Sequence, residues 1–439
     1  MARDCAGTAS LLSNGWTVLR FWESEIQKNL GECVKMTLKA VNNGITFDSP
    51  SLIPQKTFAE FFAGIGLMRI GLERQGWSIA FANDIDEQKY DMYKTHFEDA
   101  EKHFLLGDIH TLGVSQVPEV TLATASFPCN DLSLAGSMSG LQGKESSAFW
   151  GFVRILKEMK NRRPPLILVE NVPGFLASHK GADFEKALLS LNELGYGVDA
   201  FMLDAARFVP QSRQRLFVIG VLDHFSEVSG NSSGDFVLSE SCDSYESDIR
   251  PKSLARFIST HPEIRWNIRL LPDLPQRKTT LQEILEDLPE SAPEWWNSER
   301  AEYLLNQMSP RHRGIAEKMI SGSEYSCGTV FRRIRNEKSM AELRVDGLAG
   351  CLRTPRGGSG RQILFKAGKG KYFARLLTPR ECARLMGADE FKIEAPLNQA
   401  LFGFGDAVGV PVIEWIAKYY LNPVVNESMR GKALRLTAS

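Results

Sequence analysis

The sequence lacks several features that would place it in a specialised class of protein. Its seven cysteines are spread along 439 residues, with no CxxC pair and no Cys/His cluster at zinc-binding spacing. Neither a disulfide scaffold nor a structural metal site is therefore expected. No apolar run approaches the ~18 residues of a membrane span, and the amino terminus has no signal-peptide pattern. We therefore expect a cytoplasmic protein with reduced thiols and no metal.

The chain also lacks an excess of charge of either sign. Its 52 Lys+Arg balance 53 Asp+Glu, a formal net charge of −1, which excludes a polybasic arm or an acidic tail as the main feature. The balance is uneven along the chain, however. Residues 311–384 hold 17 Lys+Arg against 6 Asp+Glu, or +11, which leaves 35 against 47, or −12, for the remainder. This segregation predicts one region that binds a polyanion.

Short apolar strands alternate with helices from Thr57 onward. The expected strands are 57–62, 78–83, 121–126 and 166–169, the expected helices are 66–76, 86–97 and 148–161, and a strand pair follows at 198–203 and 215–221. This alternation predicts an α/β fold, a doubly wound, mostly parallel, Rossmann-like sheet. At about 150 residues per domain, the length allows two or three units.

The regular pattern stops after the strand pair. Residues 226–248 contain eight serines and six acidic residues with no Lys or Arg, which predicts a solvated linker. An irregular stretch rich in Arg, Pro and Gly follows, and helix signals return at 378–386, with Pro379 in the first turn, and at 408–420. The expected division is an N-terminal extension (1–55), a catalytic sheet domain (56–224), a smaller, irregular, basic domain (225–375), a return to the sheet domain (376–424) and a tail (425–439).

Glycines and acids at successive strand ends predict a nucleoside pocket. Gly64 and Gly66 lie between the first strand and its helix, where backbone N–H groups can approach a ligand. A glycine turn alone is as often structural. Asp84 at the end of the next strand and Asp108 after the following apolar segment strengthen the functional interpretation. Because the turn has no third glycine and no P-loop lysine, a nucleoside is favoured over a pyrophosphate.

A thiol and a carboxylate follow two further strands. Cys129 comes just after the strand at 121–126, beside Pro128, and Glu170 follows the strand at 166–169. A lone thiol is more often a buried structural group, but both residues face the crevice where doubly wound sheets place reacting groups. Together they suggest a nucleophile and an acid. Arg213 and Arg215 share one face of the next strand, either solvated or supporting a thiolate, a phosphate or a base carbonyl.

Read in order, six motifs resemble those of the DNA cytosine-C5 methyltransferases. They are Phe62-Ala63-Gly64-Ile65-Gly66, Pro128-Cys129, Glu170-Asn171-Val172, Gln211-x-Arg213-x-Arg215, Arg380-Glu381-Cys382-Ala383-Arg384-Leu385 and Gly405-Asp406-Ala407-Val408. The resemblance covers roughly residues 56–424. It places that family's target-recognition domain at 225–375, which contains most of the basic segment. Asp406 departs from a usual Asn, and Ile85 from a frequent aromatic residue.

The resemblance implies a mechanism and assigns a role in it to several residues of this chain. The Cys129 thiolate would attack C6 of a cytosine flipped out of the duplex, Glu170 would bond and protonate N3, and C5 would take the methyl group of S-adenosylmethionine. Arg213 would bond the base carbonyl, and Arg215 would support the loop. The implied protein is a monomer that methylates specific sites in double-stranded DNA, with a cognate restriction endonuclease as its functional partner.

The resemblance also assigns binding residues. Asp84 would hold the ribose hydroxyls and Asp108 the adenine amino group, with Phe62, Gly64 and Gly66 on the methionine side and Pro128 nearby. The complete set expected at the cofactor is Phe62, Ala63, Gly64, Gly66, Asp84, Ile85, Asp108, Ile109, Pro128, Asp406, Ala407 and Val408. The set expected at DNA is Arg332, Arg333, Arg335, Arg353, Arg356 and Arg361, since arginines in a glycine loop or cluster suit phosphates and guanine edges.

Two alternatives stay open at this level. One branch of the same fold methylates tRNA, although the long basic insertion favours duplex DNA, and a catalytically silent DNA-binding protein could keep the fold. Residues 14–23 also resemble the closing strand of the very-short-patch repair endonucleases. The rest of that nuclease core is missing, so we expect no nuclease activity and a short extension that packs on the catalytic domain.

Overall fold

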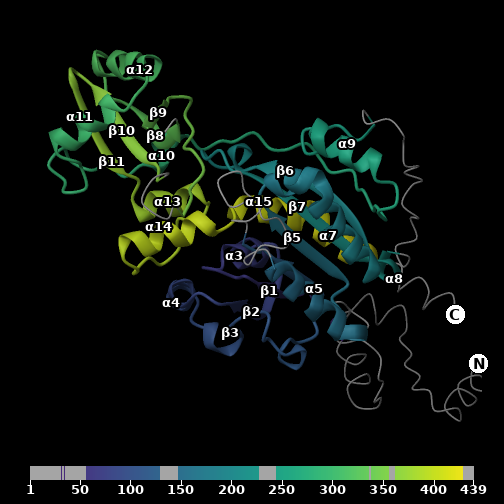
Figure 1. The fold of residues 1–439 in the computed structure, drawn as a ribbon. Coiled ribbons are helices and arrows are strands. Elements are labelled where there is room, and N and C mark those ends of the chain that lie inside the picture. Colours follow the sequence, from purple (N-terminus) through teal and green to yellow (C-terminus); the bar gives the residue numbers. More distant parts are fainter. Residues whose placement is uncertain are drawn as a thin grey trace, which may run out of the picture. The chain divides into compact units, whose positions relative to one another are not determined.

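The computed structural model describes Gly31, Val34 and residues 56–128, 147–226, 244–335, 338–354 and 361–428. Residues 54–439 form one compact unit, and residues 1–53 form a separate one. The segment that resembles a repair endonuclease lies outside the described residues, and so does Cys129. In the larger unit, the described residues form two sheets (Figure 1).

The large sheet has seven strands in the order β3-β2-β1-β4-β5-β7-β6. The strands are β1 (Thr57–Phe61), β2 (Ser78–Asp84), β3 (Phe104–Leu106), β4 (Leu122–Ala125), β5 (Leu166–Asn171), β6 (Tyr196–Asp204) and β7 (Gln214–Leu222). Neighbours from β3 to β5 pair in parallel, whereas β7 runs antiparallel between β5 and β6. The predicted doubly wound, mostly parallel sheet is therefore confirmed, and the predicted strand pair is β6 and β7.

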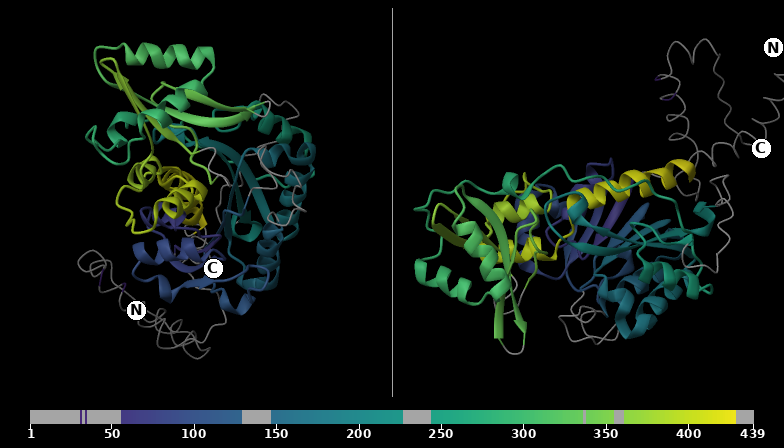
Figure 2. Two further views of the ribbon diagram at one scale, coloured as in Figure 1. Left: turned by 60° about the vertical axis from the view of Figure 1, so that its left-hand side comes forward. Right: turned by 90° about the horizontal axis from the view of Figure 1, so that it is seen from above.

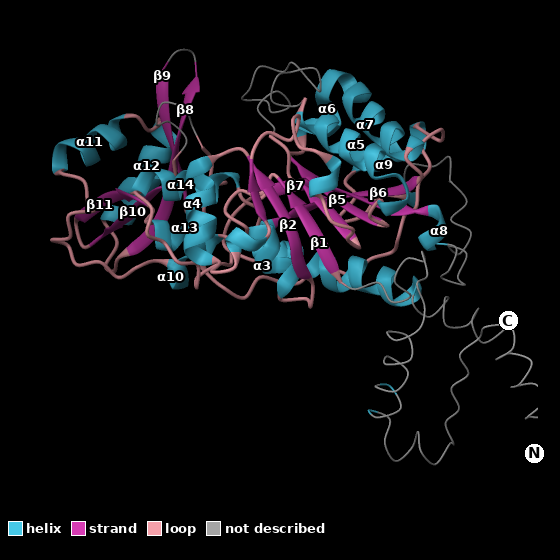
Figure 3. Cartoon of the chain, turned by 90° about the horizontal axis from the view of Figure 1, so that it is seen from below, coloured by secondary structure: helices cyan, strands magenta, loops and turns pink. Residues whose placement is uncertain are grey.

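Helices cover both faces of the large sheet (Figure 3). They are α3 (Leu67–Glu73), α4 (Glu87–His96), α5 (Ala148–Met159), α6 (Gly174–Ala177), α7 (Ala182–Glu193) and α8 (Asp223–Ser226). Every residue of β5 is buried, as a continuous apolar run between two helical layers requires. The Phe61 ring of β1 packs edge-on against Phe152 of α5 at a centroid distance of 5.3 Å.

The basic segment contains a regular domain, which differs from the irregular stretch expected from the sequence. A four-stranded antiparallel sheet has the order β11-β10-β8-β9. Its elements are α10 (Leu281–Ile284), α11 (Ser298–Asn306), α12 (Pro310–Ile320), β8 (Ser326–Arg335), β9 (Lys338–Arg344), β10 (Ile363–Gly368) and β11 (Lys371–Leu376). Its core joins residues such as Leu304, Val330 and Phe365.

Residues 244–274 lie within the expected basic domain but pack on the large sheet. Helix α9 (Lys252–Thr260) and the residues around it contribute Leu254, Phe257 and Ile258 to the core of the sheet domain. A buried ion pair joins Arg250 Nη2 to Asp199 Oδ1 of β6 at 2.8 Å. The small sheet and its helices thus begin after this segment.

The carboxyl-terminal helices lie between the two sheets and then return to the large one (Figure 2). They are α13 (Pro379–Leu385), α14 (Leu397–Asp406) and α15 (Val410–Ile416). Helix α13 confirms the expected helix at 378–386, whereas α14 was not predicted. The apolar stretch Leu397–Ser428 is long enough to cross a membrane, but 67% of its most apolar window is buried inside the protein, as in a core helix.

Candidate active site

The carboxyl ends of β1, β2, β4 and β5 meet at one edge of the large sheet, because these strands are parallel. The predicted glycine turn follows β1, Asp84 ends β2, Pro128 follows β4, and Glu170 lies near the end of β5. Asp108 follows β3 at the same edge. Most of the predicted site residues that the structure describes therefore lie at one edge of the sheet, as their positions after the strands predicted.

The turn after β1 has an unusual backbone. Phe62, Gly64 and Gly66 have φ angles of +58°, +56° and +83°, a region that costs a non-glycine residue free energy. The two glycines differ in their surroundings. A Cβ on Gly66 would lie 2.5 Å from the Phe97 ring, whereas one on Gly64 would meet only Lys89 Cδ, at 3.9 Å. Gly66 is therefore required for packing, whereas Gly64 has no closer neighbour than Lys89 on that side among the described residues.

Asp84 is tied to this turn. The Gly64 N–H donates to Asp84 Oδ2 at 2.8 Å, and the Asp86 N–H donates to Oδ1 at 2.9 Å. Burial raises the pKa of Asp84, and the charge of Lys89 opposes that shift. Next to it, the Ile85 side chain is 66% exposed. The exposed apolar side chain can contact the face of a ring, and the carboxylate beside it can accept from hydroxyl groups.

The other predicted cofactor residues divide between the site and the core. Asp108 is half-buried, and its Oδ1 accepts the His110 N–H at 2.9 Å. Ile109, in contrast, is buried with the core of the sheet domain. Ala63 and Val408 are also buried. These apolar side chains therefore belong to the protein core next to the strand ends.

Sequence reasoning missed a polar chain that joins Lys89 of α4 to the segment that follows β9. Lys89 Nζ lies 2.7 Å from Asp406 Oδ2, at the end of α14. Asp406 Oδ1 in turn accepts the Thr354 hydroxyl at 2.9 Å. Lys89 lies on α4 without a motif around it, so no sequence signal marked this contact.

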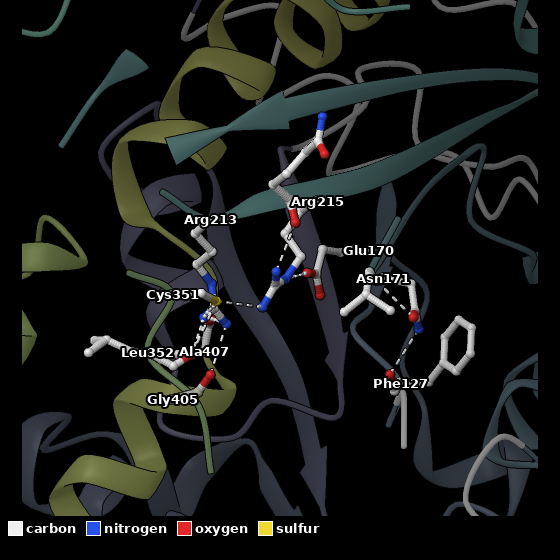
Figure 4. Close-up of polar contacts among 11 residues, drawn as sticks. Phe127, Glu170, Asn171, Arg213, Arg215, Cys351, Leu352, Gly405 and Ala407 are labelled. Carbon is white, nitrogen blue, oxygen red and sulfur yellow. Dashed lines mark hydrogen bonds and ion pairs between the residues drawn. The ribbon is translucent and has the colours of Figure 1, made fainter. Parts of the chain in front are cut away.

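Glu170 forms the buried acidic group of the site (Figure 4). Its side chain is 8% exposed, and Oε1 lies 2.9 Å from Arg215 Nε. Burial raises the pKa of Glu170, although the charges of Arg215 and Arg213 act in the opposite direction. The neighbouring Asn171 donates from Nδ2 to the Phe127 carbonyl at 3.1 Å and so links the ends of β4 and β5.

Arg213 is placed differently from the expectation that it bonds the base carbonyl. The residue is 2% exposed. Its Nη1 donates to the Leu352 carbonyl at 2.9 Å, and its Nη2 donates to the carbonyls of Gly405 at 2.9 Å and Ala407 at 2.5 Å. Burial lowers the pKa of Arg213, and Arg215 adds to that effect. Arg213 therefore fastens separate segments together, and Arg215 is the arginine that contacts the buried acid.

A second thiol, Cys351, lies among these arginines. Its Sγ accepts from Arg213 Nη1 at 3.2 Å and from Arg215 Nη2 at 3.9 Å. Burial acts to raise the pKa of Cys351, but the three guanidinium groups of Arg213, Arg215 and Arg353 outweigh it, and the pKa is lowered. From the sequence alone this cysteine has no assigned role, because Arg213 and Arg215, with which it is in contact, lie far away in the chain.

The predicted DNA-binding arginines are only partly described. Arg333 is exposed on β8, with its guanidinium 4.7 Å from the Phe331 ring centroid, and Arg332 is half-buried. The Arg361 guanidinium lies 5.7 Å from the Phe402 ring centroid. The Arg335 side chain and Arg356 lie outside the described residues. These contacts with DNA stay predictions.

Several methyltransferases resemble this chain over most of its length. The type II methyltransferase M.NgoBI of Neisseria gonorrhoeae is 27% identical over 81% of this chain and 90% of its own. The type II methyltransferase M.HaeII of Haemophilus aegyptius is 28% identical over 83% of this chain and 92% of its own. The fold is similar to that of the S. pombe Dnmt2 methyltransferase, with a TM-score of 0.53 and 17% identity over 84% of this chain and 98% of that one.

The model of one protein family, the C-5 cytosine-specific DNA methylases, matches residues 56–422. The match begins at β1 and ends just beyond α15, so it includes both sheets and every described residue of the candidate site. The resemblance seen in the six motifs is thereby confirmed. This chain belongs to the C-5 cytosine-specific DNA methylase family of S-adenosylmethionine-dependent methyltransferases.

Proposed function

We propose that this protein methylates C5 of cytosine at specific sites in double-stranded DNA, through a covalent adduct between Cys129 and C6. The observation that carries the proposal is the buried Glu170–Arg215 pair, with Nε and Oε1 2.9 Å apart, at the end of β5. The family match, in which the relatives are type II methyltransferases, supports a role in protecting DNA from a cognate endonuclease. A cytoplasmic monomer fits this role.

The raised pKa of Glu170 suits the acid in such a reaction. Because burial raises the pKa of this carboxyl group, more of it is protonated at a given pH than in an exposed Glu, and the protonated form can donate to N3 of the cytosine while the Cys129 thiolate adds to C6. Protonation at N3 makes C6 more electrophilic and lets the adduct form. From the adduct that carries the methyl group on C5, loss of the C5 proton and departure of Cys129 would restore the aromatic ring. The base must leave the duplex for these groups to reach it.

We assign the two arginines differently from the sequence-based expectation. Arg215 would hold Glu170 in place and bond the base carbonyl, since it contacts the buried acid directly. Arg213 would be a positioning residue, because both of its terminal nitrogens are engaged by main-chain carbonyls.

The residues at the edge of the sheet fit S-adenosylmethionine. Gly64 leaves room for the methionine part, Asp84 is placed to accept from ribose hydroxyls, and exposed Ile85 can cover one face of the adenine. Asp108 would bond the adenine amino group. The bound cofactor would supply an electrophilic methyl group, and the protein would orient it toward C5 of the flipped base.

We also propose that the small sheet, with helices α10 to α12, forms most of the target-recognition domain. Its strands carry Arg332 and Arg333 on β8, and the segment 311–384 has a charge of +11. Residues 244–274 would instead belong to the catalytic domain, with whose core they pack. With this division, the proposed recognition domain is smaller than the expected segment 225–375, because residues 244–274 are removed from it.

The direct test measures methyl transfer. The protein is incubated with tritiated S-adenosylmethionine and unmethylated duplex DNA, or with tRNA, and the experiment is repeated with Cys129→Ser. We expect label in duplex DNA and at least a 10³-fold loss of rate in the variant. An absence of label in DNA would contradict the proposed activity, and labelling that survives Cys129→Ser would contradict the covalent mechanism.

A further inference from the structure

The segment Ala349–Thr354 joins the small domain to the catalytic residues. It follows β9, and residues 355–360 come next in the chain. The Ala349 N–H donates to the Pro210 carbonyl at 2.8 Å, and the Ser212 N–H donates to the Ala349 carbonyl at 2.9 Å. These bonds fasten the segment beside the residues that lead into β7, which carries Arg215.

Buried side-chain contacts extend this junction. The Leu352 N–H donates to Gln211 Oε1 at 3.0 Å, while Gln211 Nε2 donates to the Leu385 carbonyl of α13 at 2.9 Å. On its other side, the segment bonds Gln362 through the Gly350 N–H at 3.0 Å. Main-chain and side-chain hydrogen bonds on both sides therefore fix the position of the segment. This position determines where the Cys351 side chain lies.

The Cys351 sulfur is the point at which this segment meets the acid–arginine pair (Figure 4). Its Sγ contacts Arg213 Nη1 at 3.2 Å and Arg215 Nη2 at 3.9 Å. The same Arg215 guanidinium reaches Glu170 Oε1 through Nε at 2.9 Å. One planar guanidinium thus contacts the sulfur through Nη2, the carboxylate through Nε and the Gln214 carbonyl through Nη1 at 2.8 Å, so the sulfur is one of three contacts that restrict its rotation.

We propose that Cys351 is a positioning residue for the methylation reaction: its sulfur orients the Arg215 guanidinium against Glu170 and so couples the recognition domain to the catalytic acid. The inference rests on the proposed function. It assigns Cys351 a polar contact in place of a packing role, and it requires no ionisation or modification of the thiol.

Substitutions that separate polarity from volume distinguish the two roles. Cys351→Ser keeps an acceptor for the arginines but leaves a smaller group, whereas Cys351→Val fills the space and offers no acceptor. If Cys351 only packs, valine should be tolerated at least as well as serine. If it positions Arg215, serine should keep most of the activity and valine should not.

The experiment measures the single-turnover rate of methyl transfer to unmethylated bacterial genomic DNA, with the dissociation constants for S-adenosylmethionine and DNA measured in parallel. Cys351→Val should lower the rate about tenfold or more, with both dissociation constants changed less than about threefold. Cys351→Ser should stay within about threefold of the wild type. Cys327→Val, at a half-buried thiol of the small sheet, is the matched control and should retain the wild-type rate.

Each outcome bears on the proposal. A rate for Cys351→Val equal to or above that of Cys351→Ser would overturn it, as would equal losses in both variants. The rate of the wild type separates this failure from a failure of the proposed function. A wild-type protein that labels no DNA contradicts both, whereas an active wild type with the wrong order of variants contradicts the role of Cys351 alone.

Discussion

Glu170 lies where burial and two arginines act on its pKa in opposite directions. Burial is the larger effect, so its pKa is raised above the ordinary value. A raised pKa keeps more of the acid protonated at a given pH, which is the form that can donate to N3. The position at the end of a fully buried strand thus determines the chemistry of the residue as well as its location.

This environment predicts how the reaction depends on pH. The rate of methyl transfer should fall as pH rises through the pKa of Glu170, because the deprotonated acid no longer donates to N3. Glu170→Gln should lower the rate about 10²-fold or more and remove this alkaline decrease. Single-turnover rates measured across pH check the prediction. A decrease of the same shape in Glu170→Gln would show that another group titrates.

Glu60 offers a second test at the residue scale, this time of stability. This residue of β1 is 2% exposed, and no donor among the described residues bonds its Oε2. Burial raises its pKa well above 4.5, against the charge of Arg69. Because the folded protein holds this proton more tightly than the unfolded chain, the free energy of unfolding should decrease as pH rises from 4.5 toward the folded-state pKa.

Glu60→Gln removes that titration. We expect it to increase the free energy of unfolding by about 1–2 kcal/mol at pH 8 and to leave it nearly unchanged at pH 4.5. Urea unfolding at both values measures the difference. Glu98→Gln, at a side chain that is 92% exposed, is the control and should change neither value. A loss of stability at pH 8 in Glu60→Gln would contradict the account.

At the scale of elements, α13 is held by its amino terminus. Glu381 is fully buried and bonds Arg375 of β11 through two nitrogens, at 2.7 and 2.6 Å. Its carboxylate also accepts the N–H groups of Thr378 and Glu286, at 2.8 and 2.9 Å. One side chain therefore caps the helix and joins it to the small sheet, as the Thr-x-x-Glu capping box of this motif would suggest.

Removal of this carboxylate should be costly. Glu381→Ala leaves the Arg375 charge buried without a partner, and we expect a loss of about 3–5 kcal/mol in the free energy of unfolding. Arg384→Ala on the same helix breaks a more exposed pair with Asp389 at 2.8 Å and should cost less than about 1 kcal/mol. Thermal or urea unfolding compares the two variants. Equal losses would contradict the special role of the buried pair.

The elements that the sequence predicted are those with a strong period or an unbroken apolar run. The apolar run Leu166–Val169 predicted a buried strand and forms part of β5. The strand pair predicted at 198–203 and 215–221 forms β6 and β7. The small sheet was missed because strands such as β9, Lys-Ser-Met-Ala-Glu-Leu-Arg, place charged residues on their exposed faces, and the composition hid the alternation. Tertiary packing, which a single sequence does not display, decided the rest.

The same limit applies to the site. Spacing located Glu170 and Asp84, because parallel strands bring their ends together. It assigned to Arg213 the role that we propose for Arg215, since two arginines on one face of a strand look equivalent until their partners are known. Cys351 and Lys89 were missed for a related reason. Their partners in the folded protein lie far away in the chain, and no sequence motif links them to those partners.

For the whole molecule, the net charge of −1 is the sum of an acidic body and a segment of +11. The small sheet gathers part of this basic charge at two opposite ends. Arg333 and Lys338 lie toward the β8–β9 turn, and Lys369 and Lys371 lie at the β10–β11 turn. At the second end, Glu324 and Glu290 pair with the lysines at 3.1 and 3.2 Å, whereas at the first end Glu342 pairs with Arg333 at a longer distance of 3.6 Å. The β8–β9 end is therefore the better candidate for contact with phosphates.

Salt dependence of DNA binding tests which end contacts DNA. Each phosphate contact that is lost should lower the slope of log K against log salt concentration by about 1. We expect Arg333→Gln to weaken binding to duplex DNA and to reduce this slope, and Lys371→Gln, the matched control at the opposite end, to change neither. Fluorescence anisotropy with a labelled duplex at several salt concentrations measures both quantities. The reverse pattern would assign the interface to the β10–β11 end, and two unchanged slopes would place the phosphate contacts elsewhere in the basic segment.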